Sequence, residues 1–179
     1  GFTWCAWVRY DKQVLNVAYL LDLSAPVIGG RSDGISFSAS SPTSHGASLY
    51  VLNSGVGTMF SVADGFFQEE HGTWAHLSAT VTRDGVMSLW SDGTTRASTN
   101  ADTCDGNDCD GWTFDNGRAV NPNNVEYSLA DVGRHDYDDK RGGGMNFVGA
   151  FRDVRIYARA LPGPELAEIA ASTRRTEAT

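Results

Sequence analysis

Residues 147–161, FVGAFRDVRIYARAL, form the most strand-like stretch of this chain. Four of its apolar residues share one parity, the pattern of a strand with one face on a sheet: Val148, Ala150, Val154 and Ile156. Arginines interleave with them, so we expect the opposite face to be wet. A strand this apolar must be covered by a second layer. The stretch therefore predicts a two-sheet protein in which Val154 and Ile156 anchor the core.

Short apolar runs recur along the rest of the chain, separated by turn residues. Residues 2–9, FTWCAWVR, carry bulk on both faces, which predicts a central strand covered on both sides. Residues 74–97 alternate and contain two Asp-Gly pairs, which predicts a three-stranded antiparallel meander. Residues 14–23 read as another strand, with a helix as the alternative. With one late helix whose first residue is Pro164, this pattern predicts an all-β fold, a two-sheet antiparallel jelly-roll β-sandwich.

The 179 residues fit one domain, which we place at residues 1–171, followed by a polar tail or linker at 172–179. Residues 98–124 lack periodicity and form an inserted loop. Within it, Cys104 and Cys109 bracket a hydrophilic hairpin. A disulfide there indicates an oxidising compartment, so we expect an extracellular or cell-surface protein.

Cys5 is left over and lies in a predicted strand. It is either a buried free thiol, or its partner lies outside the chain. The chain also opens abruptly in that strand, so we expect it to be a mature or internal segment of a larger protein or assembly.

The net charge of −8 argues against nucleic acid and anionic membranes as partners. It permits a divalent cation or a basic partner. No apolar run is long enough to span a bilayer, so we expect no direct membrane insertion.

Three blocks resemble a known family: FTWCAWVR, TWAHLSATVTRDGVMSLWSDG and FVGAFRDVRIYARALPGPEL. In this order, over roughly residues 2–170, they are similar to laminin-G-like and pentraxin-like jelly rolls of the concanavalin-A-like lectin/glucanase superfamily. The resemblance implies two packed antiparallel sheets with rim loops that bind. It also implies a pentraxin-type disulfide from Cys5, but the second position falls near Leu77 or Ser78, so that bridge is absent.

Glycoside hydrolysis needs two carboxylates that flank the scissile bond. The resembling glucanases carry Glu-x-Asp-x-Glu on one strand, and no such pattern occurs here. Glu69 and Glu70 lie in a predicted loop, and Glu126 stands alone in its strand. The four histidines form no metalloprotease-type motif. We therefore expect a protein that is not an enzyme.

Calcium takes several oxygen ligands from flexible acidic loops. One candidate loop resembles, by position, the calcium loop of pentraxins and contains Asp136, Asp138 and Asp139, with Asp22 or Asp33 as substitutes for ligands from an earlier loop. A second candidate loop surrounds the cysteine hairpin and contains Asp102, Asp105, Asn107, Asp108 and Asp110. The alternative for both loops is a solvated turn, because Asp and Asn are natural turn formers.

Aromatic side chains in loops are candidates for contact with a ligand. Trp112 lies in the insertion and Tyr137 in the first acidic loop, so we expect these two to contact a sugar or a protein. Trp7, Trp74 and Trp90 lie in predicted strands and are expected to pack on the sheets. The arginines of residues 147–161 are expected to form no site.

Together these features predict a non-catalytic extracellular recognition or adhesion module, one domain of a larger secreted or surface protein, that binds glycan or protein through rim loops. Three alternatives remain open. They are a calcium-dependent lectin, a structural building block of an extracellular assembly, and a divergent glycoside hydrolase.

Overall fold

The computed structural model describes residues 1–11, 18–24, 34–39, 47–53, 56–62, 72–83, 86–99, 129–132 and 147–174. These residues form two five-stranded antiparallel sheets with the strand orders β10-β1-β6-β7-β8 and β5-β4-β3-β2-β9. The first sheet contains β1 (Phe2–Tyr10), β6 (Trp74–Val81), β7 (Met87–Ser91), β8 (Thr94–Thr99) and β10 (Gly149–Tyr157). The second contains β2 (Ala18–Ser24), β3 (Gly34–Ala39), β4 (Ala47–Asn53), β5 (Val56–Val62) and β9 (Leu129–Val132).

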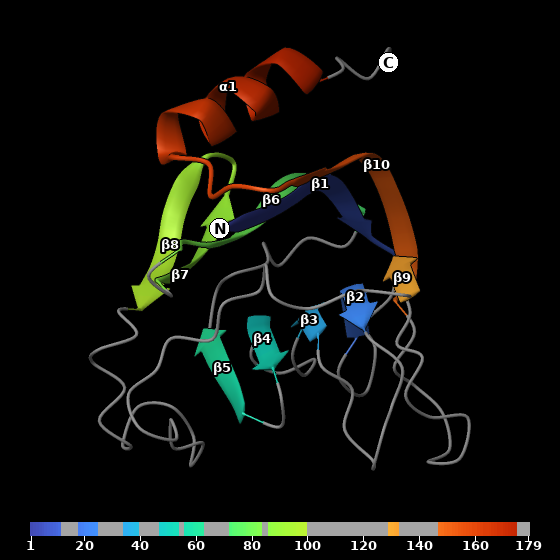
Figure 1. The fold of residues 1–179 in the computed structure, drawn as a ribbon. Coiled ribbons are helices and arrows are strands. Elements are labelled where there is room, and N and C mark those ends of the chain that lie inside the picture. The colour runs from blue at the N-terminus through green and yellow to red at the C-terminus, as the bar shows by residue number, and fades with distance from the viewer. Residues whose placement is uncertain are drawn as a thin grey trace.

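The described residues form three layers (Figure 1): the helix α1 (Gly163–Thr173) lies across the outer face of the first sheet, and the second sheet lies on the other side. The main core fills the space between the sheets, with contributions from both: Phe2, Trp4, Val8, Leu21, Ile35, Phe37, Leu49, Leu77 and Leu89. Trp4 meets Phe37 edge to face across the two sheets, with ring centroids 5.3 Å apart. This arrangement confirms the predicted two-sheet β-sandwich with one C-terminal helix.

β1 is an interior strand whose two faces are both covered, as its sequence predicts. It pairs with β10 on one side and β6 on the other. Its inward residues join the core between the sheets, and its outward residues Thr3, Cys5 and Trp7 are also buried, on the face of the sheet where α1 lies. The strand predicted over residues 14–23 is confirmed as β2 for the part that the structure describes.

The meander predicted over residues 74–97 is confirmed as β6, β7 and β8. Asp92 and Gly93 turn the chain between β7 and β8 with φ values of 50° and 74°. Both values lie in the left-handed region that favours Asp and Gly. A Cβ on Gly93 would also collide with Ala167 of α1, so this turn allows the helix to approach the sheet.

β10 corrects the prediction that Val154 and Ile156 anchor the core, because these side chains are 39% and 51% exposed. The four apolar residues of equal parity do not share one face. A bulge at Asp153, whose φ is 54°, shifts the register, so that Ala150 pairs with outward Arg9 while Ile156 pairs with inward Trp4. Since β10 is the edge strand of its sheet, its inward side chains lie at the margin of the core.

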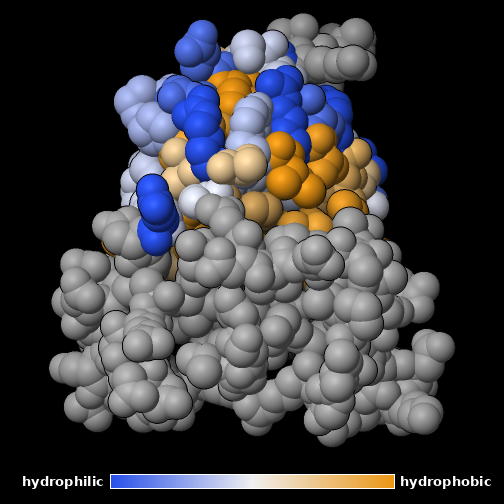
Figure 2. Space-filling view, viewed as in Figure 1, coloured by the Kyte–Doolittle hydropathy of each residue, from blue (hydrophilic) through white to orange (hydrophobic). Residues whose placement is uncertain are grey.

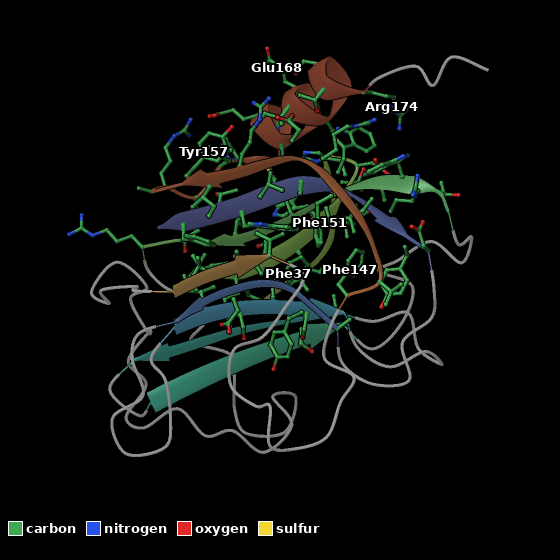
Figure 3. All side chains as sticks on the ribbon, turned by 90° about the vertical axis from the view of Figure 1, so that its right-hand side faces the viewer. Phe37, Phe147, Phe151, Tyr157, Glu168 and Arg174 are labelled. Carbon is green, nitrogen blue, oxygen red and sulfur yellow. The ribbon has the colours of Figure 1, made fainter. Side chains whose placement is uncertain are left out.

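Phe147, just before β10, and Phe151, near its beginning, pack against the core (Figure 3). They take the role that the sequence pattern assigned to Val154 and Ile156. Their ring centroids are 4.7 Å apart. Gly149 marks a close backbone approach, as predicted for a strand glycine, because a Cβ there would collide with the carbonyl oxygen of Arg9. In the part of the molecule that contains α1 and the first sheet, hydrophobic residues reach the surface among hydrophilic ones (Figure 2).

α1 begins just after Pro162 and carries Pro164 in its first turn, as predicted. Thr3 fixes the chain that leads into it. Its Oγ1 donates a hydrogen bond to the Arg159 carbonyl oxygen and accepts one from the Leu161 amide, both at 2.8 Å. Leu166 and Ala170 bury one side of the helix. No helix in the described ranges is long and apolar enough to cross a membrane.

Candidate functional site

The outer face of the first sheet carries a row of tryptophan and arginine side chains beyond the C-terminal end of α1. Strand alternation turns Trp7 and Arg9 of β1 outward together. In the register of the sheet, Arg9 stands opposite Trp74 of β6, and Trp7 stands opposite Arg152 of β10. Three strands thus bring two tryptophans and two arginines together.

Arg152 lies against both tryptophan rings. Its Cζ atom is 4.7 Å from the ring centroid of Trp74 and 5.3 Å from that of Trp7. Arg9 lies 5.3 Å from the Trp74 centroid, and Arg174 at the end of α1 lies 5.7 Å from that of Trp7. We call these five residues the arginine–tryptophan ladder. Each cation–π contact contributes about 0.5–2 kcal/mol, so the contacts hold the guanidinium groups in place.

Trp7 is the buried anchor of the ladder. It is 2% exposed, and its Nε1 donates a 2.7 Å hydrogen bond to Oγ1 of Thr173 in α1. Trp74 and Arg152 are half-buried, and Arg174 is exposed. Figure 3 shows Arg174 at the C-terminal end of α1. The ladder therefore rises from a rigid base in the helix–sheet interface to a surface that a ligand can reach.

Three of the surrounding arginines have a carboxylate partner. Arg9 binds Asp11 through two hydrogen bonds, of 2.7 and 3.1 Å, which lower the pKa of the exposed Asp11 carboxyl. Arg155 binds Asp153 in the same two-pronged way, at 2.9 and 3.1 Å, which raises the pKa of its guanidinium. Arg174 lies 3.9 Å from Asp92.

Arg152 is different. Among the described residues it forms no ion pair, and its Nε atom is buried without a hydrogen-bond partner. A guanidinium that is held by aromatic rings and lacks an anion is a group prepared to bind acceptor oxygens. This is the strongest binding feature among the described residues.

A second buried layer lies between the first sheet and α1. His76 of β6 is 0% exposed and meets Trp7 edge to face at 5.5 Å. Neither of its ring nitrogens has a hydrogen-bond partner among the described residues. Burial lowers the pKa of His76 to about 4, although the negative charge of Asp92 raises it in part. The imidazole is therefore neutral at pH 7 and has a packing role.

Cys5 is 0% exposed and forms no disulfide among the described residues, as expected for a buried free thiol. Burial raises its pKa to about 11, so the thiol stays protonated and inert at neutral pH. Ser78 stands directly opposite Cys5 in the register of β1 and β6.

The site residues predicted from sequence lie outside the described residues. This holds for both acidic loops, with Asp136, Asp138 and Asp139 in one and Asp102, Asp105, Asn107, Asp108 and Asp110 in the other. It also holds for the contact candidates Trp112 and Tyr137, for the cysteine pair Cys104 and Cys109, and for Asp33. These assignments stay predictions.

Asp22, the other substitute ligand, is described and lies in β2, 4% exposed. The register of the second sheet places Asp131 of β9 opposite it. β9 ends one residue later, where the chain enters residues 133–146 with the first acidic loop. Among the described residues, no three His, Cys, Asp or Glu side chains are arranged to hold a metal.

The sequence contained part of the signal for the ladder. Trp7 and Arg9 share a parity in β1, and Trp74 begins a strand whose other face is apolar. The missing information was that β10 and β6 flank β1, which brings Arg152 to Trp7 and Trp74. The expectation that the arginines of residues 147–161 form no site stays a prediction, and the contacts of Arg152 are the observation that weighs against it.

The sequence matches no protein-family model and no curated protein. Solved structures with a similar fold include the binding domain of botulinum neurotoxin serotype G, with a TM-score of 0.61 and 14% identity over 96% of this chain. A putative carbohydrate binding protein from Bacteroides ovatus aligns with a TM-score of 0.59 and 16% identity over 93% of this chain. A leech intramolecular trans-sialidase, complexed with 2,7-anhydro-Neu5Ac, aligns with a TM-score of 0.66 and 14% identity over 99% of this chain.

The chain spans 36%, 40% and 24% of these three chains. At such identities the likeness shows the fold, a β-sandwich shared with domains of larger proteins. The narrower laminin-G-like and pentraxin-like assignment stays a prediction.

Proposed function

We propose that this chain is a non-catalytic extracellular recognition module that binds a glycan, and that the arginine–tryptophan ladder is its binding surface. The observation that carries the proposal is Arg152, which two tryptophan rings position and which has no anionic partner among the described residues. Sugars offer hydroxyl oxygens to a guanidinium and apolar C–H faces to an aromatic ring. In the ladder, the half-buried Trp74 and Arg152 lie side by side.

Two of the neighbouring structures support a glycan as the ligand. One is named as a putative carbohydrate binding protein, and another holds a sialic acid derivative. In both, a β-sandwich similar to this one forms part of a longer chain. An extracellular setting is consistent with these neighbours and with the predicted disulfide at residues 104 and 109.

A glycan array probed with the labelled chain tests the proposal, in buffer with calcium and in buffer with a chelator. We expect binding to a defined set of glycans, and mass spectrometry should find the bound glycans unchanged after long incubation. Trp74→Ala should weaken the binding. An array without any signal, or a cleaved glycan, would contradict the proposal.

A matched pair of variants distinguishes the ladder from the loops predicted by sequence. If the ladder binds, Arg152→Met reduces the array signal, whereas Trp112→Ala and Tyr137→Ala leave it unchanged. The opposite result would keep the glycan function but move its site to the loops.

A further inference from the structure

We infer that the glycan bound at the ladder is acidic, and that Arg152 binds a carboxylate or sulfate group on the sugar. This inference rests on the proposed function and adds the class of ligand. It starts from the charge of the site, which differs from the charge of the whole chain.

The ladder and its partners carry a surplus positive charge. Its three arginines, Arg9, Arg152 and Arg174, meet two aspartates, Asp11 and Asp92, while the neighbouring Arg155 and Asp153 neutralise each other. Among the described residues one positive charge is left at this site, on a chain whose net charge is −8. A local positive charge on a chain of negative net charge attracts an anion at that place while the chain as a whole repels it.

The three aspartates are already engaged, so none of them supplies the missing partner of Arg152. Asp11 and Asp153 each accept two hydrogen bonds from their own arginine. Asp92 accepts the backbone N–H of His76 at 3.2 Å and lies beside Arg174. An incoming anion therefore does not have to displace an existing ion pair.

The geometry of Arg152 suits an oxyanion. Its Nε is buried, so a ligand has to bind the two terminal nitrogens, Nη1 and Nη2. Two parallel N–H donors match the two oxygens of a carboxylate or sulfate. Because the rings of Trp7 and Trp74 already hold the guanidinium, little side-chain entropy is lost on binding.

The test is calorimetric titration of the chain with lactose, 3′-sulfolactose and 3′-sialyllactose, which share one disaccharide and differ in the acidic group. We expect at least tenfold tighter binding of one acidic sugar than of lactose, and a loss of this preference at high salt. Arg152→Met, which keeps an unbranched stem against the rings, should remove the preference. Arg152→Lys, which keeps the charge without the fork, should retain part of it.

Arg159→Met is the matched control, because it removes the same charge from an exposed arginine that is paired with Glu165 on the same sheet face as α1. It should leave the preference intact. Melting curves of each variant establish that it is folded, and the folded Arg152→Lys variant suffices if Arg152→Met is unstable.

The outcomes separate the two proposals. Glycan binding without preference for the acidic sugars, or a preference that survives Arg152→Met, overturns the acidic class and leaves the proposed function standing. An array on which no glycan binds overturns both. Binding of polyglutamate without binding of either acidic sugar identifies a protein partner and also overturns this inference.

Discussion

Cys5 of β1 and Ser78 of β6 stand directly opposite each other on the outer face of the first sheet, and both are fully buried. The Ser78 hydroxyl has no hydrogen-bond partner among the described residues. Opposed residues on antiparallel strands have Cα atoms about 4.5–5.5 Å apart, within the range that a disulfide spans.

Ser78→Cys should therefore form a disulfide with Cys5 in oxidising buffer. The mass should fall by about 2 Da, and the bridge should raise the free energy of unfolding by about 2–4 kcal/mol because it closes a long loop. Ser78→Ala is the control, and it should change stability little or favourably because it removes an unsatisfied polar atom. Two thiols that stay free in the Ser78→Cys variant would contradict the register of β1 and β6.

His76 should make the stability of the fold depend on pH. Its pKa is about 4 in the folded chain against 6.5 when exposed. Between these values the unfolded chain binds a proton that the folded chain does not, so stability falls as the pH falls from 6.5 to about 4. The full effect is about 3 kcal/mol.

Denaturant unfolding of the wild type and His76→Leu at several pH values measures this effect. The variant should lose stability less steeply over the same window, because it removes the buried base. A direct check is the NMR titration of the His76 ring. A midpoint near 6.5 would contradict the buried, unpartnered imidazole.

A third prediction compares a residue at the margin of the core, Ile156, with one at its centre, Leu89. Ile156→Ala should cost less than about 1 kcal/mol, because that side chain is half exposed on the edge strand. Leu89→Ala, at a fully buried position of the same sheet, should cost about 2–5 kcal/mol. Chemical denaturation compares the two variants, and equal losses would show that Ile156 belongs to the core after all.

The calcium loops predicted from sequence can be tested without a ligand. Calcium should release or absorb heat on titration and raise the melting temperature, because cation binding stabilises the folded state. Asp136→Asn with Asp138→Asn should remove the effect if the first loop binds. Asp105→Asn with Asp108→Asn should remove it if the second loop does. No heat and no shift in the wild type would contradict both sites.

The sandwich was predictable because its signals are local. The alternation in β6 and the Asp-Gly turn after β7 are each contained within a few residues, and FTWCAWVR showed by itself that both its faces are covered. The inward side of β10 was predicted wrongly for two reasons that no local pattern contains. The bulge at Asp153 shifts the alternation by one residue, so that apolar residues of equal parity lie on opposite faces before and after it. Because β10 is the edge strand, Ile156 lies at the margin of the core.

The candidate site was less predictable than the fold. A strand pattern shows which residues of β1 face outward, but it does not show which strands lie beside it. The contacts of Arg152 join residues 7, 74 and 152, so they depend on the order of strands in the sheet. The loops that the sequence favoured lie outside the described residues, so the two kinds of site have to be compared by experiment.

NMR mapping of an array-selected glycan tests the central claim most directly. Spectra of the chain with and without the sugar report the indole N–H signals of Trp7 and Trp74 and the Nε–H signal of Arg152. We predict that Trp74 and Arg152 shift in proportion to occupancy, with a smaller shift for the buried Trp7. Shifts confined to residues 98–124 or 133–146, with Trp74 and Arg152 unmoved, would contradict the ladder as the binding surface.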